Sequence, residues 1–169
     1  MSALLTQCQR LIFPPEPLPI RAGEQLREGN NYPNVIGVPD WRAHQAGKRT
    51  YAVNPVYPGP DGDLCRWAVL DIDEGADSLK KAAALLALCE VAGLSARAAW
   101  SGGKGCHVWL FFEPASVSLA TAVLKRLKAA VEFTGEIIPG NLPRAKVPPA
   151  FHQVKRFWAF FFETLPDTA

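Results

Sequence analysis

Two aspartates, Asp71 and Asp73, stand at the end of a short apolar run over 66–73 (RWAVLDID), which predicts a β-strand. Residues i and i+2 of a strand point to the same face, so the two carboxylates are expected side by side. Adjacent carboxylates repel each other, and hard oxygen ligands of this kind suit Mg²⁺ or Mn²⁺. A plainer interpretation stays open, in which the strand ends in solvent at a polar Asp-Glu-Gly turn.

A glycine-rich loop follows at 101–107, with the sequence Ser-Gly-Gly-Lys-Gly-Cys-His. Three glycines within five residues let backbone N–H groups approach an anion closely, and Lys104 adds a positive charge. The pattern is not a Walker A loop, because no Ser or Thr follows the lysine. The alternative is a tight connection between two strands, a place where glycine is common.

His107 opens the next predicted strand and alternates with Trp109 and Phe111, so the three side chains share one face. A histidine in this position is either a hydrogen-bonded core residue or, beside the glycine-rich loop, a contact for a phosphate group. Both interpretations are compatible with the pattern.

Further downstream, Glu136 opens a short apolar stretch and is a candidate third metal ligand, with a turn or capping role as the alternative. The segment 144–152 (RAKVPPAFH) then places Arg144, Lys146 and His152 in a stretch stiffened by proline. Cations held in this way suit a triphosphate. The alternative interpretation of this segment is a basic loop that covers the sheet.

The elements that must position these residues can be read from periodicity and end signals. Besides the strand at 66–73, strands are expected at 50–56, 97–100, 106–112, 136–138 and 157–162. Asp77 or Ser78 can cap a helix that runs to about Ala92, and Ser116 or Ser118 can cap one that runs to about Phe133. The order β-α-β-β-α-β from residue 66 onward predicts an α+β fold with a ferredoxin-like (RRM-like) split βαβ core.

Residues 1–40 form a proline-rich N-terminal extension, and residues 41–169 form the expected catalytic domain. Pro14, Pro15, Pro17 and Pro19 disfavour regular structure, so the extension is expected to cross the surface as a strap or to be partly disordered.

Composition sets further bounds. The net charge is only +2, but 97–156 contain nine Lys or Arg against three acids, which suits a site for polyanions and, equally, a solvated helix face. The four cysteines form no C-x-x-C pair, which argues against a zinc knuckle or a disulfide framework.

The N-terminus is unlike a signal peptide, and the apolar run 82–89 is too short to span a bilayer. A cytoplasmic protein without a membrane partner is expected.

Taken together, the D-x-D motif at 71–73, the S-G-G-K-G-C-H motif at 101–107 and the later acid Glu136 resemble the archaeo-eukaryotic primase superfamily. The serine-to-histidine motif is similar to that of polymerase domains of bacterial end-joining ligases. It is more similar still to primase-polymerases of mobile elements and of conflict or CRISPR-associated systems. Residues 44–50 and 146–152 resemble further segments of these primases, so the likeness extends over about residues 40–162.

This resemblance implies a template-dependent nucleotidyltransferase, a DNA primase or primase-polymerase that adds nucleotides to a 3′-hydroxyl by two-metal phosphoryl transfer. The acids Asp71, Asp73 and Glu136 would hold Mg²⁺ or Mn²⁺. An NTP or dNTP would be bound by eight residues: Ser101, Gly103, Lys104, Gly105, His107, Arg144, Lys146 and His152.

The implied partners are single-stranded or primer-template DNA, together with a helicase or an accessory priming domain on another chain. The alternative is a catalytically weak or inactive module that binds nucleic acid or nucleotide on the same fold, since many members have Asp where this chain has Glu136. The choice between NTP and dNTP, and between replication, repair and mobile-element defence, stays open.

Overall fold

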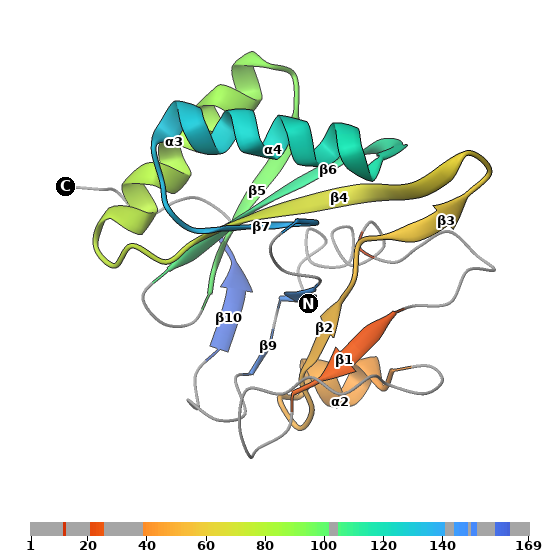
Figure 1. The fold of residues 1–169 in the computed structure, drawn as a ribbon. Coiled ribbons are helices and arrows are strands. Elements are labelled where there is room, and N and C mark those ends of the chain that lie inside the picture. The colour runs from red at the N-terminus through yellow and green to blue at the C-terminus, as the bar shows by residue number, and fades with distance from the viewer. Residues whose placement is uncertain are drawn as a thin grey trace.

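A computed structural model describes residues 12, 21–25, 39–101, 105–140, 144–148, 150–151 and 158–162. The fold is α+β, as predicted, with antiparallel sheets and helices packed on them (Figure 1). The strands are β1 Ala22–Glu24, β2 Tyr51–Val53, β3 Tyr57–Gly59, β4 Gly62–Ile72, β5 Ser95–Trp100, β6 Cys106–Ser116, β7 Glu136–Ile138, β8 Ala145–Lys146, β9 Ala150–Phe151 and β10 Trp158–Phe161. The helices are α2 Trp41–Gln45, α3 Asp77–Val91 and α4 Val117–Val131.

The main sheet has the strand order β3-β4-β6-β5-β10-β9, and β7 pairs with β4 on the edge that β3 also uses. All of these pairs are antiparallel. The centre of β4 is apolar at consecutive positions, Trp67 to Leu70, and each of these residues is at most 1% exposed. Such a run requires cover on both faces of the sheet.

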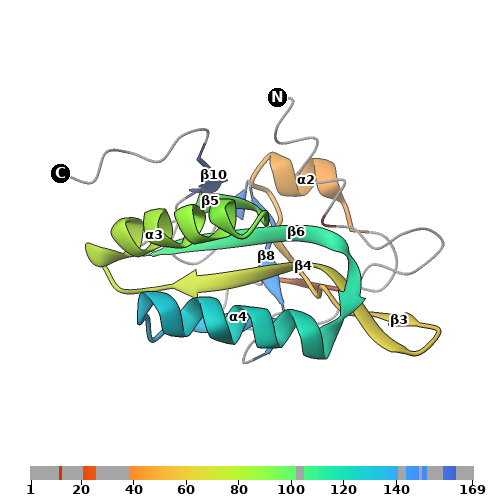
Figure 2. The same ribbon diagram turned by 90° about the horizontal axis from the view of Figure 1, so that it is seen from above.

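Helices α3 and α4 lie side by side over one face of this sheet (Figure 2). Ser116 caps α4 by accepting a hydrogen bond from the Leu119 N–H at 3.3 Å, as predicted. The predicted cap of α3 is wrong, because its N-cap is Ala76, which has no capping side chain. Ser78 is instead buried in the first turn, where its Oγ accepts from the Glu74 N–H at 2.9 Å.

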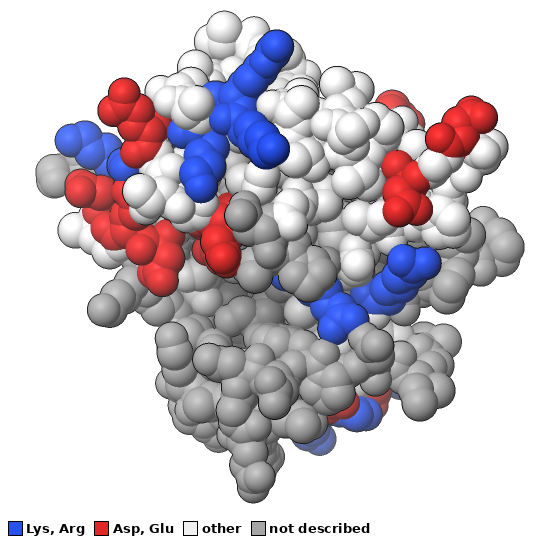
Figure 3. Space-filling model, viewed as in Figure 1, with Lys and Arg blue, Asp and Glu red and all other residues white. Residues whose placement is uncertain are grey.

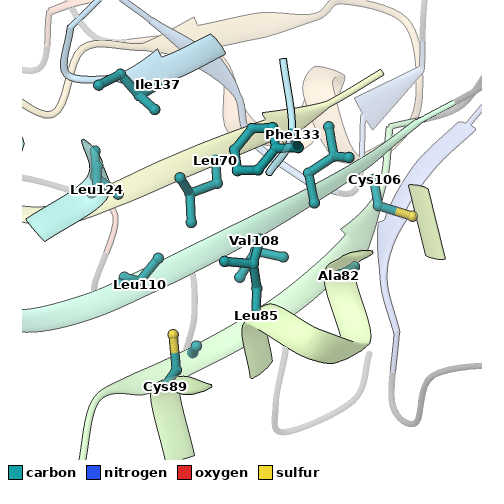
Figure 4. Packing of buried hydrophobic residues seen from close by; sticks show 13 residues of the cluster. Leu70, Ala82, Leu85, Cys89, Cys106, Val108, Leu110, Leu124, Phe133 and Ile137 are labelled. Atoms are coloured by element: carbon teal, nitrogen blue, oxygen red, sulfur yellow. The ribbon is translucent and has the colours of Figure 1, made fainter. Parts of the chain in front are cut away.

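The core between the helices and the sheet is built from residues that alternate along the strands and recur every three or four positions along the helices (Figure 4). Leu70 and Val108 from the sheet meet Leu85 and Leu124 from the helices, and all four are fully buried. Cys106 belongs to the same core, and burial raises the pKa of its thiol to about 11. This thiol therefore stays protonated and acts as an apolar packing group.

The opposite face of the main sheet is covered by a three-stranded sheet with the order β1-β2-β8. Val53 and Val147 pack there against Trp67 and Trp109. No helix among the described residues is both long enough and apolar enough to span a membrane.

The N-terminal extension is more integrated than a surface strap, which corrects that expectation for its described part. Residues Ala22–Glu24 form β1 and pair with β2, and Ile12 is only 1% exposed. The Trp67 indole N–H donates to the Ile12 carbonyl at 2.7 Å, so a core side chain depends on this segment for its hydrogen bond. Pro14 to Pro19 lie outside the described residues.

His44 joins the small sheet to α2. Its side chain is fully buried, Nε2 lies 2.7 Å from the Val147 carbonyl, and Nδ1 accepts from the Tyr51 N–H at 3.0 Å. The Nδ1 acceptor requires a neutral ring that carries its proton on Nε2. His44 is therefore a structural residue that ties three chain segments together.

We expect the protein to lose stability in mild acid because of His44. Burial lowers the pKa of His44 below the ordinary value of about 6.5, which the unfolded chain retains. As the pH falls below about 6.5, the unfolded state takes up a proton before the folded state does. The free energy of unfolding then decreases by up to about 1.4 kcal/mol per pH unit until the lowered pKa is reached. Thermal melts from about pH 8 to pH 5.5 would measure this, and His44→Gln should flatten the slope; an equally steep slope in that variant would contradict the assignment.

Candidate active site

Three of the predicted site residues lie in one row across neighbouring strands. Asp71 on β4 is directly opposite Glu136 on β7 and, on its other side, directly opposite His107 on β6. Directly opposed residues of antiparallel strands share a face, with Cβ atoms about 4.5–5.5 Å apart. Pairing thus brings Asp71 beside residues that are 36 and 65 positions further along the chain.

This row lies on the sheet face that points away from α3 and α4. Trp67 and Val69 precede Asp71 at two-residue spacing and belong to the core under the small sheet. The Asp71 side chain is 26% exposed, whereas Trp67 and Val69 before it on the same face are fully buried. The row therefore marks the place where the buried interface between the two sheets opens to solvent.

His107 contacts Asp71 directly. Its Nε2 lies 3.1 Å from Asp71 Oδ1, and His107 is only 7% exposed. This geometry agrees in part with the alternative interpretation of a hydrogen-bonded core histidine, because the ring is buried and lies within hydrogen-bonding distance of a carboxylate. Its partner, however, is the candidate metal-binding carboxylate.

Asp73 lies one residue beyond the end of β4 and is exposed. The predicted strand 66–73 is thus one residue too long at this end, because Ile72 is the last residue paired with β6. Within the described ranges, no group of three His, Cys, Asp or Glu side chains is close enough to hold a metal ion. The joint role of the three acids stays a prediction.

Two glycines allow neighbouring backbones to approach residues 71–73 from both sides. A Cβ on Gly105 would lie 2.3 Å from the Ile72 carbonyl oxygen and 3.1 Å from the Asp73 Cα. A Cβ on Gly135 would lie 1.9 Å from the Asp71 carbonyl oxygen. Real Cβ atoms do not approach backbone so closely, so packing by itself requires glycine at both positions.

The glycine-rich loop is closed at its base by Ser101. Its Oγ donates to the Gly105 carbonyl at 2.9 Å, and its N–H donates to the same oxygen at 3.1 Å. Gly103 and Lys104 lie outside the described residues. The structure therefore describes how the loop is anchored beside Asp73, and the predicted phosphate contacts remain untested.

The predicted cationic segment reaches the same face through the small sheet. Arg144 is half-buried and precedes β8, in which Lys146 pairs with Ala52 of β2. The flanking Ala145 and Val147 are buried in the core that also contains Val69. His152 lies outside the described residues.

Sequence reasoning missed a polar network at the entrance to β7. Glu74 accepts from the Thr134 N–H at 2.6 Å and from Thr134 Oγ1 at 3.2 Å, and it forms an ion pair with Lys81. The hydrogen bond from Lys81 lowers the pKa of Glu74 most, and the bond from the Thr134 N–H lowers it further. The Glu74 carboxyl group is therefore ionised at neutral pH. Its position directly after Asp73 is the signal that could have found it, but the sequence Asp-Glu-Gly by itself indicates only a polar turn.

Acidic and basic side chains gather at the end of the molecule where β4 leads into α3 (Figure 3). The exposed acids here include Asp73 and Asp77, with Lys80 exposed beside them on α3. The charge on this end is therefore mixed rather than of one sign.

Comparison with known proteins supports the resemblance. Residues 34–135 match the family described as the Archaeo-Eukaryotic Primase domain of the TOTE conflict system. The match contains Asp71, Asp73 and the loop to His107, and it ends one residue before Glu136. No curated protein is significantly similar in sequence.

Among solved structures, the fold is similar to the polymerase domain of Mycobacterium tuberculosis ligase D in complex with DNA. The TM-score is 0.53 and the sequence identity is 21% over 81% of this chain. The chain spans 60% of the length of that polymerase domain. At this identity the likeness concerns the fold, whereas the family match covers more than half of the chain. The chain thus belongs to the archaeo-eukaryotic primase domain family of TOTE conflict systems.

Proposed function

We propose that this chain is a template-dependent nucleotidyltransferase of the primase-polymerase type, which joins nucleotides to a 3′-hydroxyl on a DNA template. The observation that carries the proposal is the row of Glu136, Asp71 and His107 across three paired strands. Two carboxylates and a histidine on directly opposed strand positions, with Asp71 and His107 in contact at the point where a buried interface opens to solvent, suit phosphoryl transfer more than packing.

The three acids at this site fit a divalent metal by the chemistry of their donors. Asp71, Glu136 and the exposed Asp73 supply hard carboxylate oxygens, and they lie on adjacent strands or one step beyond a strand end. They would hold Mg²⁺ or Mn²⁺, which when bound lowers the pKa of an attacking hydroxyl and stabilises charge on a leaving phosphate. His107 holds Asp71 from the opposite side and thereby restricts the rotamers of this carboxylate.

The chain's own contribution would be to bind and orient the incoming nucleotide. In this proposal Ser101, Gly103, Lys104, Gly105 and His107 bind the triphosphate. Arg144, Lys146 and His152 neutralise its charge from the small-sheet side. The anchored loop base beside Asp73 and the pairing of β8 with β2 support this arrangement.

His107→Ala is expected to raise the apparent KM for nucleotide by about 10-fold or more, the scale of one lost hydrogen bond to a charged group. Steady-state kinetics of incorporation, with nucleotide and primer-template varied separately, measure the effect. If the KM is unchanged and only kcat falls, His107 acts through Asp71 and has no phosphate role.

The decisive experiment is an extension and de novo synthesis assay. Labelled NTPs or dNTPs are supplied with single-stranded DNA or primer-template DNA, in Mg²⁺ or Mn²⁺. Template-directed products that require the metal support the proposal, and the same assay measures the preference between NTP and dNTP. Absence of any product with every substrate and metal contradicts it.

A module that binds nucleic acid or nucleotide without efficient catalysis is the second candidate. It is favoured by the position of Asp73 beyond the paired end of β4 and by the exposure of Glu136. Such a module should bind DNA equally well with and without Mn²⁺, which a binding titration tests.

The ferredoxin-like core belongs to the same proposal. It is supported by the strand order β7-β4-β6-β5, with α3 between β4 and β5 and α4 between β6 and β7. The proposal also includes a catalytic domain over 41–169 and a cytoplasmic location. Its expected protein partner is a helicase or an accessory priming domain.

A further inference from the structure

We propose that Glu74 is a positioning residue that sets the spacing between Asp71 and Glu136 by holding the segment 132–135 at the entrance to β7. This inference rests on the proposed function, because it assigns to Glu74 the placement of one predicted metal-binding carboxylate relative to another. Glu74 itself need not touch metal, nucleotide or DNA.

The contacts of Glu74 join two chain segments that are 60 residues apart. One carboxylate oxygen accepts both the N–H (2.6 Å) and the hydroxyl (3.2 Å) of Thr134, and the other oxygen pairs with Lys81. The Glu74 N–H donates to the buried Ser78 hydroxyl, which anchors the glutamate to the first turn of α3. The carboxylate therefore bridges the turn that follows Asp73 and the residue two positions before Glu136.

Two lysines complete the attachment of this segment. Lys81 Nζ donates to the Glu132 carbonyl at 2.9 Å, and Lys128 Nζ donates to the Thr134 carbonyl at 3.2 Å and to the Gly135 carbonyl. The carbonyls of 132, 134 and 135 are thus all bound by ammonium groups from α3 or α4. A segment held by so many charge-assisted bonds has a restricted position.

The position of this segment determines where Glu136 lies. Glu136 is the first residue of β7, a strand of three residues in which only Ile137 and Ile138 are buried. These two apolar side chains hold the far part of the strand. The near part, which contains Glu136, is held by the polar bonds to 132–135, by the buried Phe133 within that segment and by the approach of Gly135 to the Asp71 carbonyl.

Two substitutions and one control separate positioning from general stability. Glu74→Ala removes the acceptor and the ion pair. Glu74→Gln keeps an oxygen for Thr134 and loses the charge and the acceptor for Lys81. Glu90→Ala is the matched control, because Glu90 is an exposed acid on α3.

We expect Glu74→Ala to lower kcat for nucleotide incorporation by about 10- to 100-fold, the scale of an ångström-level misplacement of a reacting group. The KM values for nucleotide and DNA should remain within about 2-fold of wild type, since a positioning defect falls on kcat. Glu74→Gln should restore kcat to within about 5-fold of wild type, since the bonds to Thr134 are kept and a solvent-accessible ion pair contributes little by itself. Glu90→Ala should match the wild type.

Two readouts do not depend on catalysis. Mn²⁺ titration, followed by the metal-induced rise in Tm, should show an affinity about 10-fold weaker for Glu74→Ala, as for other residues that orient metal ligands. Hydrogen exchange should be faster at the Thr134 amide in Glu74→Ala, while the amides within α4 keep their wild-type protection.

The inference is overturned if Glu74→Ala keeps the wild-type Mn²⁺ affinity, or if Glu74→Ala and Glu74→Gln are impaired to the same extent. A wild-type protein that binds Mn²⁺ but makes no product would count against the proposed function alone. In that case the Mn²⁺ titrations of the variants still decide whether Glu74 positions the acids.

Discussion

Asp71→Ala should abolish template-directed incorporation, with kcat reduced by at least about 10²–10³-fold, the scale at which the loss of a single electrostatic contact lowers kcat. Asp71 is the middle residue of the row, opposite both Glu136 and His107. Its removal takes away one of the predicted metal ligands and the partner of the histidine at once. Asp71→Asn keeps the shape and an acceptor for His107, and it should be comparably inactive because the negative charge is gone.

The matched control is Asp63→Ala, an exposed aspartate at the other end of the same strand. It should retain wild-type activity. Melting curves should place all three variants within a few degrees of wild type, because Asp71 is partly exposed and anchors no core packing. Retained activity in Asp71→Ala would contradict the assignment of this row as the active site.

Gly135→Ala should damage the structure more than alanine at any other glycine among the described residues, because its added methyl group has the closest backbone contact. The added Cβ would lie 1.9 Å from the Asp71 carbonyl oxygen and 3.0 Å from its carbon, and these backbone atoms cannot yield without moving β4. Overpacking of this kind costs about 1–3 kcal/mol, and in a protein of this size each kcal/mol lowers Tm by about 2–4 °C. Relief of the clash would push β7 away from β4, so we also expect weaker metal binding and lower kcat below the Tm.

Gly93→Ala is the control for this substitution. Gly93 has a φ of +68°, and a Cβ added there would meet open space, so alanine adds only the cost of the left-handed backbone, about 1–2 kcal/mol. It should destabilise the fold without changing kcat. If both glycine variants have wild-type kcat, the approach of Gly135 to Asp71 does not position the site.

The family match and the geometry of the row complement each other. The match includes the D-x-D motif and the loop to His107, whereas Glu136 follows its last residue. Pairing between β4 and β7 brings this glutamate opposite Asp71. Glu136→Gln is therefore the variant that would separate an active enzyme from a binding module in the extension assay.

Local pattern was sufficient for the helices and strands that carry the motifs. Short apolar runs predicted the strands now seen as β4, β5, β6 and β7, and the boundaries of β7 agree with the prediction. The spacing of apolar residues and Ser116 predicted α4 with its cap. These signals are readable because each depends on residues a few positions apart, with periods of about 2 or 3.6.

The small sheet could not be predicted in this way. Its strands β1 and β8 have only three and two residues, and each exists because β2 offers a backbone partner far away in the chain. Helix α2 was missed for a related reason, since five residues give too little periodicity. The buried roles of Ile12 and His44 likewise depend on Trp67, Val147 and Tyr51, which only the folded chain brings near them.

Residue types and short-range periodicity were enough to find the groups that could do chemistry and to place Asp71 and His107 on strands of an α+β fold. The folded chain was needed to learn that Glu136 lies opposite Asp71, that Gly105 and Gly135 are required by backbone contact, and that Glu74 reaches Thr134. The period of a strand determines the face on which a side chain lies, whereas its neighbour across the sheet depends on the register between distant segments.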